Sequence, residues 1–214
     1  DLDRAEMAEI TALKVQQKNR ERASVYLDGR FAFGLPAIIA ARLKVGQVLT
    51  EAEIQALQNE GSTESAYSRT LDYLGYRPRS RSEVVSYLKK RGMEEEQIET
   101  IVERLERAGL LDDAAFAQYW VENRERFKPR GARALRYELR RKGLADADID
   151  KALETLDASD SAYRSASRKA EQLRHLDRQT FSRKLIEYLA RRGFDYAVAQ
   201  EAANRHWSEL AEGD

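Results

Sequence analysis

The chain repeats itself about every fifty residues, and this repeat constrains its fold more than any other feature. Three segments share one order of apolar, basic and glycine residues, and their glycines, Gly92, Gly143 and Gly193, lie 51 and 50 positions apart. Such a period is typical of arrays in which each small unit buries part of its apolar surface against its neighbours. We therefore expect three units in tandem.

Each unit is predicted to contain three helices, because apolar residues recur at helical spacing and glycine or proline stands at the expected ends. In the first unit Pro78 ends the first helix, and Ser80 with Glu83 forms a capping box for the second. Gly92 ends this second helix in the left-handed conformation. The third helix begins in the glutamate run 94–96, which the helix dipole favours.

The first part of the chain has a different period. Between residues 10 and 35 apolar residues alternate with polar ones, and Asp28-Gly29 provides a two-residue turn, so we expect a three-stranded meander. A short helix is predicted from about 36 to 43, and Thr50 with Glu53 is predicted to cap another. The predicted fold class is mainly α, with three tandem three-helix repeats of helix-turn-helix type after a small strand-containing module.

The predicted domain boundaries follow from composition and from the repeat. Residues 60–65 have the sequence Glu-Gly-Ser-Thr-Glu-Ser, which is typical of loops, so the N-terminal module is expected to end there. The predicted divisions are the module at 1–62 and the helical repeats at 63–110, 111–158 and 159–214.

Charge follows the same period as the glycines. The chain carries 37 Lys and Arg against 37 Asp and Glu. Residues 122–142 nevertheless hold nine positive and three negative charges, and residues 143–163 one positive and six negative. The first and third units alternate in the same way. Because a neutral total can conceal strong local fields, the distribution is more informative than the sum.

Helix dipoles explain the charges next to helix ends but leave other cations unexplained. Several of these stand near helix N-termini, where positive charge costs about 0.3 to 1 kcal/mol each. A solvated loop and helix start is one interpretation, and contact with a phosphate or an acidic partner is the other. The candidate partner-binding residues are Arg77, Arg79, Arg81, Lys128, Arg130, Arg133, Arg136 and Arg140.

Other prominent side chains are expected to be structural. Asp112 and Asp113 suit the N-cap of the helix that follows them. Four aromatic residues on first helices are predicted to lie in the core rather than to stack on bases, because they recur at helical spacing. They are Tyr67, Phe116, Tyr119 and Trp120.

The composition argues against catalysis, cofactors and metals. The chain has no cysteine, and His175 and His206 have no acidic residues at ligand spacing around them. Carboxylates lie mostly on third helices, which we interpret as solvated faces rather than as Mg²⁺ ligands of a nuclease. No catalytic residue, metal or cofactor is predicted. No apolar run reaches about 18 residues and signal-peptide order is absent, so a cytoplasmic protein without a membrane partner is expected.

Three motifs in this order resemble the RecX family of bacterial regulatory proteins. They are Arg77-Pro78-Arg79-Ser80 with Glu83, Gly109-Leu110-Leu111-Asp112-Asp113 with Phe116-Ala117, and Lys128-Pro129-Arg130-Gly131 before Glu138-Leu139. The resemblance is strong over residues 66–157 and looser to about 207. The N-terminal module is similar to the strand-bearing extension of longer members.

This resemblance implies a non-enzymatic modulator of the RecA recombinase. Such a protein binds in the helical groove of the RecA filament on DNA and restrains its recombinase and ATPase activities. It thereby regulates homologous recombination, DNA repair and the SOS response. The candidate cations would then contact the RecA filament or its DNA, and a monomer is expected.

The residues themselves are compatible with that partner and leave one alternative open. A tandem array suits a repeating partner such as a filament, and bands of both charges suit protein surfaces. A three-helix unit with a basic second helix also resembles helix-turn-helix modules, so a direct DNA-binding protein is the alternative. Arg133, Arg136 and Arg140 share one helix face by spacing. Base-reading residues are absent beside them, so weak contact with the DNA backbone is the most that is predicted.

Overall fold

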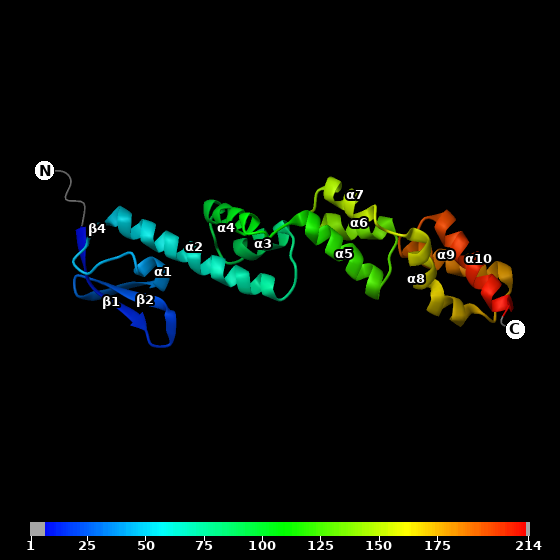
Figure 1. Cartoon of the computed structure of the whole chain (residues 1–214), viewed down its shortest axis with the longest axis horizontal. Helices are drawn as coiled ribbons and strands as arrows, with labels where there is room; N and C mark the ends of the chain where they lie inside the picture. Colours follow the sequence, from blue (N-terminus) through cyan, green and yellow to red (C-terminus); the bar gives the residue numbers. More distant parts are fainter. Residues whose placement is uncertain (1–6, 213–214) are drawn as a thin grey trace. The chain divides into compact units, whose positions relative to one another are not determined.

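The structure, a computed structural model, describes residues 7–212 and begins with an antiparallel sheet. Its strands are β1 (Met7–Gln16), β2 (Asn19–Leu27), β3 (Arg30–Pro36) and β4 (Val48–Thr50), in the spatial order β3-β2-β1-β4. Figure 1 shows the strands of this sheet in blue, near the N-terminus of the chain. The predicted meander is confirmed. Its turn residues Asp28 and Gly29 both have positive φ, 48° and 81°, as tight hairpins favour. Strand β4 was not predicted, because three residues are too few to show alternation.

Residues 1–6 of the predicted module and 213–214 of the predicted third repeat lie outside the described part of the chain. One face of the sheet packs on helices α1 (Ala37–Ala40) and α2 (Glu51–Gly75). The predicted helix at 36–43 is therefore present but shorter. The capping box of Thr50 and Glu53 is confirmed.

Residues 60–65, the expected boundary of the N-terminal module, lie inside the continuous helix α2. Its hydroxyl side chains bond within the helix: Thr63 Oγ1 donates to the carbonyl of Asn59 at 2.9 Å, and Ser65 Oγ to that of Gly61 at 2.8 Å. Gly61 also allows close packing, since a Cβ there would lie 2.6 Å from Leu35 Cδ2. Helix α2 thus contacts the sheet and also α4 (Glu95–Arg107) of the first repeat.

The remaining helices complete three tandem three-helix repeats, as the period predicts. The first repeat contains the end of α2, then α3 (Arg81–Lys89) and α4. The second contains α5 (Asp113–Phe127), α6 (Ala132–Arg141) and α7 (Asp146–Leu153). The third contains α8 (Ala158–Leu173), α9 (Arg178–Arg191) and α10 (Tyr196–Glu212). None of the helices in the described residues combines the length and apolar character that crossing a membrane requires.

Local signals correctly predicted the start of α3 and the ends of the three middle helices. Ser80 and Glu83 exchange two hydrogen bonds of 3.2 Å, one from each backbone N–H to the other's side chain, so the predicted capping box is confirmed. The three repeat glycines, Gly92, Gly143 and Gly193, have φ of 73°, 80° and 88°, so the left-handed helix ends are confirmed too.

The second and third repeats have separate apolar cores, and the predicted aromatic residues divide between core and surface. Phe116 is buried in the second core with Leu135 and Leu139. Tyr67 is buried and Trp120 half-buried, but Tyr119 is 39% exposed, so its core prediction is wrong. In a repeat array one face of each helix meets solvent, and spacing alone does not identify that face.

By its internal contacts the chain divides into two compact units, and the first turn of α3 belongs to the second of them. This unit consists of Pro78–Val84 and the chain from Ala108 onward. Within it the same junction occurs twice. Ser80 Oγ donates to the carbonyl of Lys142 at 2.7 Å, and the N–H of Gly131 donates to the carbonyl of Arg192 at 3.0 Å. In both places the start of one middle helix meets the end of the next, where opposite ends of the helix dipoles attract.

Candidate interaction surface

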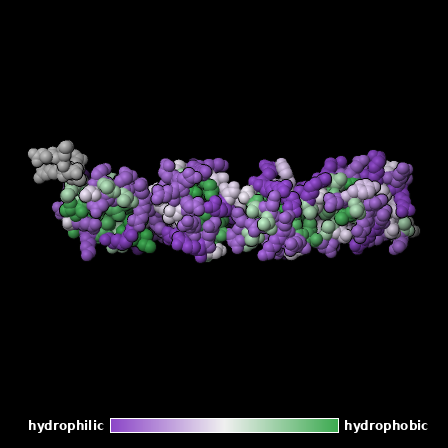
Figure 2. Space-filling view, turned by 90° about the horizontal axis from the view of Figure 1, so that it is seen from above, coloured by the Kyte–Doolittle hydropathy of each residue, from purple (hydrophilic) through white to green (hydrophobic). Residues whose placement is uncertain are grey.

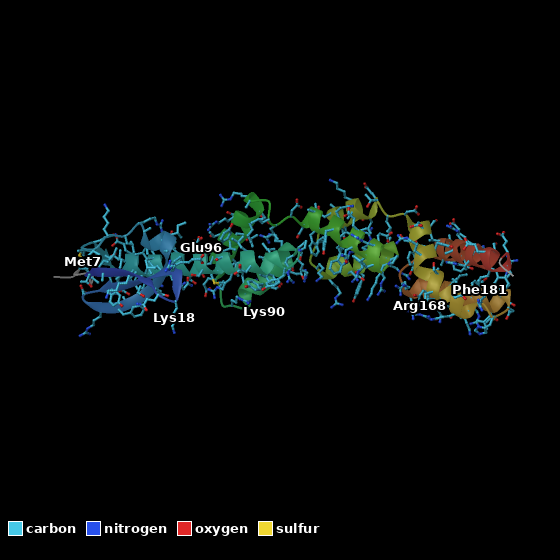
Figure 3. The ribbon with its side chains drawn as sticks, turned by 60° about the horizontal axis from the view of Figure 1, so that its bottom comes forward. Met7, Lys18, Lys90, Glu96, Arg168 and Phe181 are labelled. Carbon is cyan, nitrogen blue, oxygen red and sulfur yellow. The ribbon has the colours of Figure 1, made fainter. Side chains whose placement is uncertain are left out.

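Charged side chains dominate the surface of the protein. Figure 2 shows hydrophilic residues over most of the visible face, with small, separate hydrophobic areas. Lys90, just after α3, and Glu96, in the first turn of α4, illustrate the exposed charges of both signs (Figure 3). A candidate site must therefore be identified by which charges remain uncompensated.

Helix α6 carries arginines that pair with the next helix. Arg136 Nη1 lies 2.5 Å from Asp150 Oδ1, and Arg140 bonds both carboxylate oxygens of Asp146 at 2.8 and 3.2 Å. The hydrogen bond from Arg140 lowers the pKa of Asp146, and the same bond raises the pKa of Arg140. These two candidate cations are thus compensated by acidic residues of α7.

A different side of α6 faces the end of α9 across an open groove. Arg133, Tyr137 and Arg141 follow one another at intervals of four residues, which places them on one helix face. The groove has a volume of about 530 Å³. We call it the α6–α9 groove and define it by Arg130, Arg133, Tyr137, Glu138, Arg141 and Arg191.

The groove is strongly basic. Glu138 is its only acidic lining residue, and Glu138 Oε2 already accepts hydrogen bonds of 2.8 Å from Arg124 Nε and Trp120 Nε1. Among the described residues, none of Arg130, Arg141 and Arg191 has a carboxylate within ion-pair distance. Four arginines therefore share a groove whose one acid is engaged elsewhere.

The predicted site residues are distributed over several environments. The structure brings Arg130 and Arg133 together in the groove, where Arg133 Nη2 donates to the carbonyl of Ala190 at 2.7 Å. It separates Arg136 and Arg140 from them. Lys128 is exposed just after the end of α5.

The three candidate arginines around α3 are half-buried and engaged in interactions within the protein. The backbone N–H of Arg81 donates to Asp113 Oδ1 at 2.7 Å, so Asp113 contacts the start of α3 and its predicted role as cap of α5 is wrong. Asp112 does cap α5, accepting from the N–H of Ala115 at 2.9 Å, as predicted.

The site residues predicted from the sequence do not include Tyr137, Arg141 and Arg191. The four-residue spacing from Arg133 could have indicated the first two. No local signal could have indicated Arg191, because it comes from another repeat and reaches the groove only through the junction.

The two histidines lie in different environments. His206 is buried and stacks on Tyr163 with ring centroids 4.2 Å apart, and its Nε2 lies 2.9 Å from the carbonyl of Tyr163. His175 is exposed. No group of three or more histidines and carboxylates suited to a metal ion occurs within residues 7–212.

Comparison with known proteins agrees with the fold. Models of the RecX family match the N-terminal domain at residues 8–50 and the first, second and third three-helix domains at 66–105, 112–153 and 157–203. The regulatory protein RecX of Bacillus licheniformis is 31% identical over 92% of this chain and 76% of its own length. That of Bacillus subtilis gives the same three values.

Solved structures agree with these sequence matches. A crystal structure of regulatory protein RecX is similar with a TM-score of 0.77 and 30% identity, over 92% of this chain and 99% of that one. RecX from Lactobacillus salivarius shares the fold, with a TM-score of 0.61 over 70% of this chain and 97% of its own. The chain belongs to the RecX family of regulatory proteins.

Proposed function

We propose that this protein binds the RecA recombinase filament on DNA and inhibits its recombinase and ATPase activities, and so modulates recombination and DNA repair. Membership of the RecX family, with all four family domains in order, is the observation that carries the proposal. Relatives are named as regulatory proteins, which favours a non-enzymatic role.

The repeat array supports this partner physically. A filament offers the same surface at regular intervals, and tandem repeats can contact such a surface at several points. Alternating basic and acidic helices would set the register of binding, because charge complementarity acts mainly on orientation and association rate. We propose that the arginines of the α6–α9 groove supply much of the positive charge that contacts the filament.

A RecA ATPase and strand-exchange assay on single-stranded DNA, with this protein titrated in, tests the proposal. Both activities should fall as the protein is added, because a bound regulator restrains the filament. RecA activity that stays constant up to a large excess of the protein contradicts the proposal.

Direct binding to DNA is the second candidate function, and the uncompensated arginines of the groove favour it. It predicts tight binding to DNA without RecA, with an affinity that falls steeply as salt rises. If such binding occurs while RecA activity is unaffected, this second function replaces the first.

We further propose that the protein acts as a cytoplasmic monomer. Sedimentation equilibrium of the purified chain should give a mass near 24.6 kDa. A mass near twice that value contradicts the monomer.

A further inference from the structure

We infer that the α6–α9 groove binds a single strand of nucleic acid, with its arginines on the phosphates and Tyr137 under a base. This inference rests on the second candidate function, direct binding to DNA, and deepens it by naming the site and the kind of strand; the groove would bind such a strand with no RecA present. The inference rests on the charge, the spacing and the exposed ring of the groove.

The charge of the groove suits phosphate. Arg141 and Arg191 are exposed and have no carboxylate partner among the described residues. Arg133 gives one donor to Ala190, and a guanidinium has five N–H donors. The planar fork of arginine matches a phosphate with two parallel hydrogen bonds, and its weak hydration lowers the cost of that contact.

The spacing suits an extended strand rather than a single anion. Arg133 and Arg141 lie eight residues apart on α6, which corresponds to about 12 Å along the helix axis. One strand of a duplex has a phosphate about every 3.4 Å of axis, and an extended single strand spaces its phosphates further apart, so this length covers at most about three phosphates. Arg191 adds a cation from the end of α9.

Tyr137 distinguishes a nucleic acid from an acidic protein segment. Its side chain is 62% exposed, between the two arginines on the same helix face. The guanidinium carbon of Arg141 lies 5.8 Å from its ring centroid. An exposed aromatic ring within a basic groove is the usual platform for an unpaired base, whereas an acidic peptide gains nothing specific from it. Because every base has a face that can stack on a ring, binding through Tyr137 should depend little on sequence.

Fluorescence anisotropy with a labelled oligothymidine of about 20 nucleotides, full-length protein and no RecA tests the inference. The variant with Arg141→Gln and Arg191→Gln should bind about tenfold more weakly. Its slope of log affinity against log salt should shrink by about 1.4, since two phosphate contacts are lost.

The matched control changes two arginines of the same helix that pair with α7. Arg136→Gln with Arg140→Gln removes the same amount of positive charge, but these two arginines pair with Asp150 and Asp146 outside the groove. The affinity of this variant should therefore stay within about twofold of the wild type. Circular dichroism checks that both variants fold. Equal weakening by the two variants overturns the inference, because total charge rather than the groove then determines binding.

The ring is tested separately. Tyr137→Ala should weaken binding about tenfold, the effect expected of one lost stacking contact, while Tyr137→Phe should retain it. The inference is overturned if Tyr137→Ala binds the oligothymidine as tightly as the wild type does. If the wild type also binds duplex DNA and the oligothymidine with equal affinity, the groove contacts the duplex backbone instead. Displacement by polyglutamate as effective as by oligothymidine assigns the groove to an acidic protein and also overturns the inference. Because RecA is absent, these failures leave the proposed inhibition of RecA standing.

Discussion

Gly193 lies where the second and third repeats come closest. Its φ of 88° suits glycine, and a Cβ added there would lie 2.5 Å from Ala134 Cβ. The facing position is equally tight, because a Cβ on Gly131 would overlap the carbonyl oxygen of Gly193. Two glycines thus allow two middle helices to meet through backbone hydrogen bonding rather than through side chains.

Gly193→Ala is therefore expected to destabilise the protein by about 2 to 3 kcal/mol, the sum of left-handed strain and overlap. The matched control is Gly92→Ala, because Gly92 has a φ of 73° but no neighbouring atom within 4 Å of an added methyl carbon. The free energy of unfolding of Gly92→Ala should fall by only about 1 kcal/mol, because the added methyl group causes left-handed strain but no overlap. Urea unfolding followed by circular dichroism measures both. Equal losses would show that the close approach of the repeats contributes nothing.

Helix ends were the most predictable elements, because their signals are local. The capping boxes at Thr50 and Ser80 and the glycine helix ends follow from spacing within a few residues. Other features depend on tertiary context. The 60–65 segment has loop composition but packs as helix on the sheet, and Tyr119 has core spacing but meets solvent.

The α6–α9 groove shows the same limit for the candidate site. Arg136 and Arg140 could be located on α6 from the sequence, but their pairing with α7 depends on how two helices pack. Arg191 lies in the groove only because the third repeat docks on the second. Sequence spacing identifies a basic helix, whereas the structure identifies which of its cations remain available.

Helix α9 gives a pH-dependent prediction. The backbone N–H groups of Thr180 and Gln179 donate to Asp177 Oδ1 at 3.0 Å each. The bond from Thr180 is the main reason that the pKa of Asp177 is lowered. A carboxyl group whose pKa is lowered by folding stabilises the fold above its unfolded-state pKa, and loses that contribution as pH falls through the folded-state pKa.

Asp177→Asn keeps the capping oxygen but cannot titrate. The wild type should be more stable than this variant at pH 6, because a charged cap also interacts with the helix dipole. This advantage should shrink as the pH falls below about 4. Thermal unfolding at both pH values measures it, and an advantage as large at pH 3 as at pH 6 would contradict the assignment of this cap.

The zero net charge of the chain does not mean that it lacks a charged surface. The chain carries 37 positive and 37 negative residues, yet the acidic α7 compensates only one side of α6. The other side leaves the groove arginines without carboxylates among the described residues. In the second repeat, the basic segment therefore contains arginines that pair with the acidic α7 and arginines of the groove that have no carboxylate partner in the described part of the chain.

Inhibition of RecA by the wild type and the two matched double variants tests the account most directly. The ATPase of RecA on single-stranded DNA is measured as each protein is titrated in. We predict that Arg136→Gln with Arg140→Gln inhibits like the wild type, because these arginines are occupied by α7. Arg141→Gln with Arg191→Gln should need about tenfold more protein for half inhibition. Equal inhibition by both variants, or none by the wild type, would contradict the account.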